Sequence, residues 1–185
     1  MSERIKKLIK PMIVIATFVF VTCCLIKKPV IFEDCSAYLG YAISIVGILF
    51  VVYERVLWRF ISWNRPPILK NNYDGVISYV YKKQPSTKDI KISVKQTWTT
   101  IEITTKTDIN ASYTITGTIV NEYGVDVLYY TYVTEPSAIH QGENPIQYGT
   151  CRIVLDGKNE NIKGKYWTSS QTIGDIEWTA ISQKS

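Results

Sequence analysis

One arginine stands apart in the second part of the sequence. Arg152 is the only arginine after residue 65, in a stretch that contains eleven lysines. Its planar guanidinium suits paired hydrogen bonds to a phosphate or to a base edge. The face that it takes on a strand is ambiguous, because Cys151 and Ile153 favour the opposite face as the inner one, whereas Tyr148 and Val154 favour its own. The pattern leaves open a ligand contact or a surface position.

Aromatic side chains supply a second kind of ligand chemistry. Ten of the thirteen tyrosines lie after residue 65, together with Trp98, Trp167 and Trp178. Such rings offer stacking surfaces for nucleobases, although aromatic residues also favour strands for packing alone. We expect two or three of these rings at most to contact a ligand.

Residues for catalysis or metal binding are sparse. A single histidine, His140, excludes a histidine cluster, and three of the four cysteines lie in or beside apolar runs, which excludes a Cys₂His₂ zinc site. No glycine-rich phosphate loop or nucleophile elbow is present. The carboxylates of Asp175 and Glu177 fit the solvated face of a strand. We therefore expect a binding protein with no catalytic residue, metal or cofactor.

Two uncharged apolar runs precede this polar region. They are Met12–Ile26 and Cys35–Tyr53, and the nineteen positions of the second span about 28 Å as a helix, enough for a hydrocarbon core. The short link Lys27–Asp34 makes the two helices antiparallel neighbours. A cleaved signal peptide is the alternative for the first run, but no small-x-small cleavage site follows it. The sequence predicts a transmembrane anchor with a juxtamembrane segment in residues 1–65.

The positive charge is concentrated around these runs. Residues 1–65 hold nine Lys or Arg and four Asp or Glu, whereas residues 66–185 hold twelve of each. The flanks outside the two runs are more basic than the link between them, which predicts that both termini are cytoplasmic. The neutral second part argues against long nucleic acid as a partner.

The second apolar run carries a face of small residues, which would let helix backbones approach closely. This face either packs within the hairpin or contacts another copy of the protein. Its members are spaced three and four positions apart: Ala37, Gly40, Ser44 and Gly47.

After Pro66 and Pro67 the sequence alternates with a period of two, and turn-like breaks separate segments rich in Val, Ile, Thr and Tyr. The pattern predicts an all-β domain over residues 66–185, an antiparallel up-and-down barrel of about eight strands whose closure removes exposed edges. The expected strands are Tyr73–Tyr81, Ile90–Trp98, Ile101–Thr105, Ser112–Val120, Val125–Val133, Tyr148–Leu155, Ile162–Ser169 and Ile176–Ile181.

Two details of this domain stay open. Ile90–Val94 and Ile101–Ile103 have opposite parity, so either a bulge near Thr99 and Thr100 or a tight turn between two strands is needed. The longest link, Glu135–Pro145, contains His140 and is either a lid over one mouth of the barrel or an ordinary polar loop.

Short motifs follow the predicted membrane hairpin in a fixed order. Together they resemble the two-transmembrane β-barrel effectors of bacterial cyclic-oligonucleotide antiphage (CBASS) systems, and the resemblance covers nearly the whole chain. The motifs are Gln96–Trp98, Tyr130–Tyr132, Gly149–Thr150, Gly164–Thr168 and Gly174.

This resemblance implies a function in phage defence. The cytoplasmic barrel would bind a cyclic dinucleotide that a partner nucleotidyltransferase makes after infection. Binding would drive homo-oligomerisation of the anchors in the inner membrane, disrupt its lipid bilayer and stop the infected cell. The alternatives are a lipocalin-like barrel for a lipid and a membrane-anchored scaffold for a protein partner.

Candidate contacts with the cyclic dinucleotide follow from side-chain type and barrel position, and each has ordinary packing as its alternative role. On this hypothesis Arg152→Ala should abolish ligand-dependent toxicity in a folded, membrane-bound protein. The candidates are Arg152, Tyr79, Trp98, Tyr132, Tyr148 and Lys165.

Overall fold

The computed structural model describes residues 3–27, 31–61, 65–81, 84–137 and 145–181. It divides into two compact units. The first comprises residues 1–65 together with Thr97–Thr99, and the second comprises Pro66–Gln96 with Thr100–Ser185. His140, which the sequence places in a lid or a polar loop, lies outside the described residues.

Two long helices form the first unit: α1 (Glu3–Lys27) and α2 (Phe32–Arg55), followed by the short 3₁₀ helix η1 (Leu57–Arg59). Leu8–Ile26 and Phe32–Arg55 are long and apolar enough to cross a membrane by length and composition. Both predicted apolar runs therefore lie inside helices. The helices extend beyond the runs because the charged and polar residues at their ends, lysines above all, also form helix readily.

The two helices pack through a few side chains and leave the small-residue face free. Ala42 and Val46 of α2 are buried at 0% and 7% exposure. A Cβ atom added at Gly40 or Gly47 would meet nothing within 4 Å. The glycines of this face thus take no part in packing within the hairpin.

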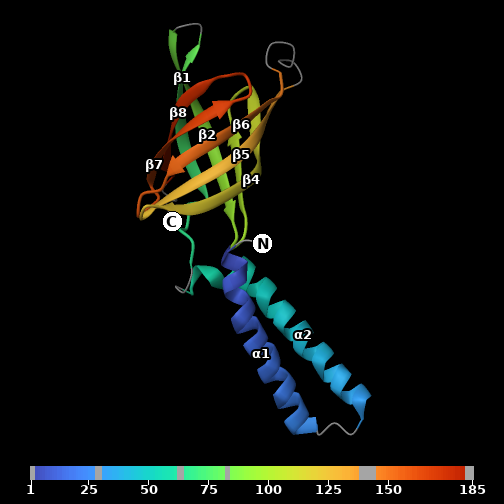
Figure 1. Ribbon diagram of the computed structural model, residues 1–185. Helices are drawn as coiled ribbons and strands as arrows, with labels where there is room; N and C mark the ends of the chain where they lie inside the picture. Colours follow the sequence, from blue (N-terminus) through green and yellow to red (C-terminus); the bar gives the residue numbers. More distant parts are fainter. Residues whose placement is uncertain (1–2, 28–30, 62–64, 82–83, 138–144, 182–185) are drawn as a thin grey trace. The chain divides into compact units, whose positions relative to one another are not determined.

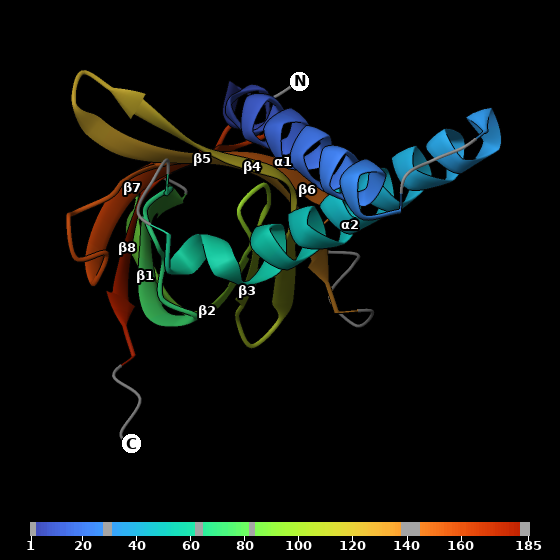
Figure 2. The same cartoon turned by 90° about the horizontal axis from the view of Figure 1, so that it is seen from below.

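Eight antiparallel strands form a closed barrel in the second unit, each paired with its neighbours in the sequence and the last with the first (Figure 1). Figure 2 shows β7, β8, β1, β2 and β3 following one another around the ring. The strands are β1 (Asn72–Tyr81), β2 (Gln84–Gln96), β3 (Ile101–Lys106), β4 (Asn110–Glu122), β5 (Val125–Pro136), β6 (Gln147–Val154), β7 (Asn161–Thr168) and β8 (Ile173–Ala180).

The prediction of an up-and-down barrel with about eight strands is confirmed. The parity change after Val94 is explained by a turn and not by a bulge, because Gln96 pairs with Ile101 across a hairpin. The chain reverses there, so the isoleucines of both strands face inward. A register shift does occur, but in β4, between Thr114 and Thr116.

Candidate functional site

One half of the barrel interior is a packed core. Its side chains come from the end at which β1 begins and β2 ends, and each is at most 3% exposed. Such packing is normal for the interior of a small barrel. The main contributors are Tyr73, Ile92, Val94, Leu128, Ile153, Ile162 and Trp178.

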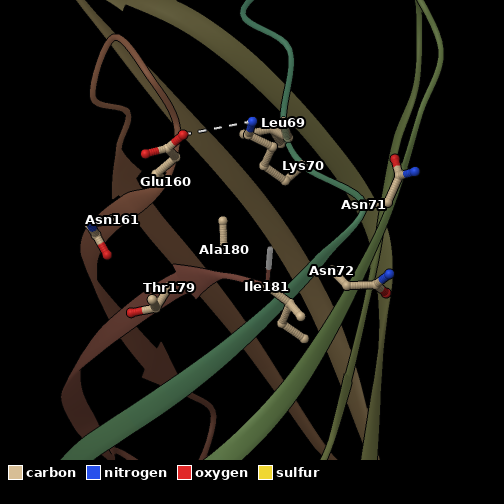
Figure 3. A pocket seen from close by; sticks show the side chains of 9 residues that line it. All are labelled: Leu69, Lys70, Asn71, Asn72, Glu160, Asn161, Thr179, Ala180 and Ile181. Carbon is tan, nitrogen blue, oxygen red and sulfur yellow. Dashed lines mark ion pairs between the residues drawn. The ribbon is translucent and has the colours of Figure 1, made fainter. Parts of the chain in front are cut away.

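The other half of the interior holds a cavity of about 450 Å³. This volume falls in the range of small-molecule sites. Exposed residues form most of the walls of two larger hollows of about 630 and 840 Å³ (Figure 3 shows the first). The second of these shares Lys88, Ile90 and Thr107 with the interior cavity. The interior cavity is the candidate site, because a ligand there would be surrounded by inward-facing side chains from most strands of the barrel.

Four tyrosine rings line this cavity, from strands β1, β5 and β7, and two glycines make room for them. Gly149 is paired with Tyr132 on the neighbouring strand, and a Cβ at Gly149 would lie only 2.3 Å from that ring. A Cβ at Gly174 would lie 2.6 Å from the ring of Tyr166. Each glycine lets a ring lie across its strand. The four are Tyr79, Tyr130, Tyr132 and Tyr166.

Polar groups complete the lining. Lys88 of β2 is the one cation among the described lining residues, and no carboxylate is among them. Asn110 and Gln147 contribute amides, and Asn110 Oδ1 is buried with no hydrogen-bond partner among the described residues. Hydroxyl groups come from Thr105, Thr107, Ser112, Thr134, Thr168 and Thr172. The cavity therefore offers stacking surfaces, base-edge partners and one positive charge.

Burial shifts the acid groups of this lining toward their neutral forms. Burial raises the pKa of the Cys151 thiol to about 12 and the pKa of Tyr166 to about 12. It also raises the pKa values of Tyr130 and Tyr132. These groups are thus uncharged at neutral pH, and a hydroxyl or thiol here acts as a hydrogen-bonding group, not as an anion that would repel phosphate.

These shifts predict that the barrel loses stability at alkaline pH. A group with a raised folded-state pKa stabilises the fold fully below its unfolded pKa, and this contribution is lost as the pH rises through the folded value. From about pH 9 upward, each group ionised only in the unfolded chain should lower the free energy of unfolding by about 1.4 kcal/mol per pH unit. Urea unfolding at several pH values measures this slope.

Cys151→Ser provides the control, since serine does not titrate in this range and is similar in size. Between about pH 9 and pH 11, the free energy of unfolding of this variant should fall less steeply with pH, because one titrating group has been removed. A free energy of unfolding that stays constant over this range in the unmodified protein would contradict the expected shifts.

Of the six sequence-predicted contacts, the structure places Tyr79 and Tyr132 in the cavity wall. Arg152 lies on the outer face, because Cys151 and Ile153 are the inward residues of β6. Its Nη2 donates to Glu122 at 2.6 Å and its Nε donates to the Tyr129 hydroxyl at 2.9 Å. These hydrogen bonds occupy the guanidinium outside the cavity.

The hydrogen bonds among Arg152, Tyr129 and Glu122 favour the ionised form of the Glu122 carboxylate. The Tyr129 hydroxyl and the Arg152 guanidinium both donate to Glu122, and together they lower its pKa. The network links side chains of β4, β5 and β6 on the outer face of the barrel wall.

The remaining three candidates also lie away from the cavity. Trp98 is fully buried in the first unit, with its ring centroid 5.6 Å from that of Tyr53. Tyr148 is 59% exposed, and Lys165 is exposed on the face opposite to Tyr166. Only two of the six candidate residues are therefore brought together.

Sequence reasoning missed Lys88, although a signal for it existed. Lys88 has the same parity as Ile90 and Ile92, so extending the alternation by two residues would have placed it inside. The prediction began that strand at Ile90, whereas β2 begins at Gln84. Tyr166 was also missed. It is adjacent to Trp167 in the motif Gly164–Thr168, and the sequence does not show which of the two rings faces inward.

An eight-stranded barrel with half of its interior open to a polar cavity is a small-molecule binding domain. Residues 65–180 match a family model described as Cap15, cyclic dinucleotide receptor domain. The chain is 35% identical over 141 residues to CD-NTase-associated protein 15 of Staphylococcus schleiferi, covering 75% of this chain and 76% of the relative. The chain belongs to the Cap15 family, and the resemblance to CBASS effectors seen in its sequence is confirmed. Every lining residue that the structure describes lies in the matched range.

Proposed function

We propose that this protein is a membrane-anchored receptor that binds a cyclic dinucleotide in the barrel cavity and acts through assembly, not catalysis. Residues 1–65 serve as the transmembrane anchor and residues 66–185 as the cytoplasmic sensing domain. The observation that carries the proposal is the cavity itself, whose described lining residues include one cation and four tyrosine rings inside the range matched to a cyclic dinucleotide receptor.

The unpaired ammonium of Lys88 points to an anionic ligand. Lys88 is half-buried, lines both the interior cavity and the hollow of about 840 Å³, and has no ion pair with a carboxylate among the described residues. A charge in such partly desolvated surroundings is costly unless it is paired. A phosphate group would supply the missing counter-charge, and hydroxyl donors on the opposite wall would supply further hydrogen bonds.

The neutral remainder of the wall fits a compact nucleotide. Tyrosine rings stack on nucleobases of any kind, and the amides of Asn110 and Gln147 can pair with base edges. A cyclic dinucleotide carries two phosphates and two bases, which matches a site with one lysine, two amides and several rings better than it matches a long polyanion.

The same polarity disfavours the two alternative functions. A lipid-binding barrel needs an apolar cavity for the acyl chain, whereas the wall of this cavity combines isoleucines and tyrosine rings with hydroxyl groups, two amides and an ammonium. A scaffold that binds a protein partner would have a filled barrel and a binding patch on its outer surface. This alternative does not explain the interior cavity.

Assembly in the inner membrane is supported by the features of the helices. Each of the two apolar segments is long enough to span a hydrocarbon core, and the basic flanks favour cytoplasmic termini. Gly40 and Gly47 leave an exposed face on α2 that nothing in the hairpin fills. We propose that ligand-bound copies associate through this face, that the bilayer is then disrupted, and that a partner nucleotidyltransferase supplies the ligand.

Thermal unfolding of the full chain in detergent with a panel of ligands tests the receptor function. A cyclic dinucleotide at 100 times its dissociation constant should stabilise the barrel by about 2.7 kcal/mol. Fatty acids and the corresponding linear dinucleotides serve as controls. Stabilisation by fatty acids but by no cyclic dinucleotide would support the lipid-binding alternative and contradict the proposal.

A further inference from the structure

The segment that connects the helices to the barrel is held by buried polar side chains. This connecting segment is Pro66–Lys70, and its Leu69 is only 3% exposed. Gln96, 6% exposed, accepts a hydrogen bond from Leu69 N at 2.9 Å through Oε1 and donates to Pro67 O at 2.8 Å through Nε2. A buried amide that satisfies two backbone groups fixes that backbone firmly.

Two more buried side chains hold the same segment. The Tyr73 hydroxyl accepts from Lys70 N at 2.9 Å and donates to Asn159 O at 2.9 Å. Asn159 Nδ2 donates to Ile68 O at 3.0 Å. At the surface, Lys70 and Glu160 lie 3.9 Å apart as an ion pair (Figure 3). Gln96, Tyr73 and Asn159 together are called the clamp.

A continuous series of ring contacts leads from the cavity to this clamp. Tyr132 and Tyr130 line the cavity, and their centroids are 5.8 Å apart. Tyr130 lies 6.2 Å from Trp178, and Trp178 lies 5.4 Å from Tyr73. When a ligand fills the cavity side of Tyr130, a displacement of this ring is passed to Trp178 and Tyr73, because these rings lie in a close-packed core.

An unused donor and an unused acceptor lie beside Tyr73 of the clamp. Trp178 Nε1 and Asn159 Oδ1 are buried, and neither has a hydrogen-bond partner among the described residues. Both residues contact Tyr73, one through its ring and the other through its hydroxyl. Buried polar groups are rarely left unpaired without a reason. A two-state element requires a second hydrogen-bond arrangement, and these two groups are the donor and the acceptor that could form one around Tyr73.

We propose that the clamp transmits ligand binding to the helices. A ligand that contacts Tyr130 and Tyr132 shifts the ring series, withdraws the Tyr73 hydroxyl from Lys70 N and frees the connecting segment. The anchors of different copies then gain the freedom to associate. This inference rests on the proposed function, since it assigns a mechanism to the same cavity.

Hydrogen exchange at two amides measures the state of the clamp directly. Leu69 N and Lys70 N are held by side-chain acceptors, so their exchange reports on Gln96 and Tyr73 and not on the sheet. In the full chain in detergent, saturating cyclic dinucleotide should increase exchange at both amides at least tenfold. Unchanged or slower exchange in the ligand-bound protein would overturn the inference.

Tyr73→Phe tests the causal role, because it removes only the hydroxyl and keeps the ring contact with Trp178. This variant should associate and stop cell growth without ligand. Its dissociation constant for the ligand should also fall, because binding no longer has to release the Tyr73 hydroxyl from Lys70 N. Tyr113→Phe, a change on an exposed ring of β4, is the matched control and should behave like the unmodified protein. A Tyr73→Phe protein that still requires ligand for association would also overturn the inference.

The two proposals fail in different ways. If no cyclic dinucleotide binds the unmodified protein, the proposed function fails. If the ligand binds and triggers association, but Tyr73→Phe and the two amides show no effect, only the role of the clamp fails.

Discussion

Lys88→Ala is expected to weaken cyclic-dinucleotide binding by about 10- to 100-fold, because a hydrogen bond to a charged group contributes about 1.5–3 kcal/mol. The variant removes the one cation among the described residues of the cavity wall and leaves no unpaired charge behind. Lys88→Glu should lower affinity further, since a carboxylate would face the phosphate. Calorimetric titration of the purified full chain gives both dissociation constants.

Arg152→Ala is the matched comparison. The structure places Arg152 on the outer face in an ion pair with Glu122, so its removal should cost a little stability and leave ligand affinity within about threefold. The sequence alone predicted the opposite outcome for this residue. Loss of binding in Arg152→Ala with normal binding in Lys88→Ala would show that the ligand does not use the interior cavity.

Replacing Gly40 and Gly47 together by leucine is expected to abolish ligand-dependent growth arrest while leaving ligand affinity unchanged. The hairpin tolerates the change, because a side chain at either position enters open space. Between copies, however, the added volume would hold the helix backbones apart and remove the close packing that stabilises association in lipid. Cross-linking in membranes, with and without ligand, measures association.

Leu49→Phe serves as the control for added volume. Nine residues separate Leu49 from Gly40, which places them on opposite sides of the helix, and Leu49 is 46% exposed. This variant should cross-link and arrest growth normally. Cross-linking that persists in the double leucine variant would assign assembly to another surface.

The fold was predictable because each element has a strong local signal. Thr- and Tyr-rich segments with a period of two, separated by turn residues, predict strands, and the uninterrupted succession of short links leaves a meander as the simplest topology. The structure differs mainly in strand ends. β2 begins at Gln84, not Ile90, because hairpin pairing with β1 extends the strand as far as Tyr81 opposite Gln84, which hydropathy does not reveal.

The site was harder to predict, since it depends on which face each residue takes. Arg152 was selected because it is the only arginine after residue 65. That fact does not show whether its side chain faces the interior or the outside of the barrel. Trp98 continues the parity of four inward positions of β2, so the sequence predicted that it faces the barrel interior. The strand ends at Gln96, however, and the Trp98 ring packs in the first unit. Tyr79 reaches the cavity because β1 alternates between inward and outward residues from Tyr73 onward. Tyr132 reaches it because it has the same parity as the buried Leu128 and Tyr130.

The packed half of the interior has a consequence for the dose response. Under the proposed function, a barrel whose interior is filled at one end would bind one messenger, and an assembly of several copies would need as many messengers as it has members. The concentration of fully loaded complexes then rises as a power of the messenger concentration and not in proportion to it. A low basal concentration of the nucleotide would leave the cell unharmed. A large increase would raise the concentration of fully loaded complexes steeply.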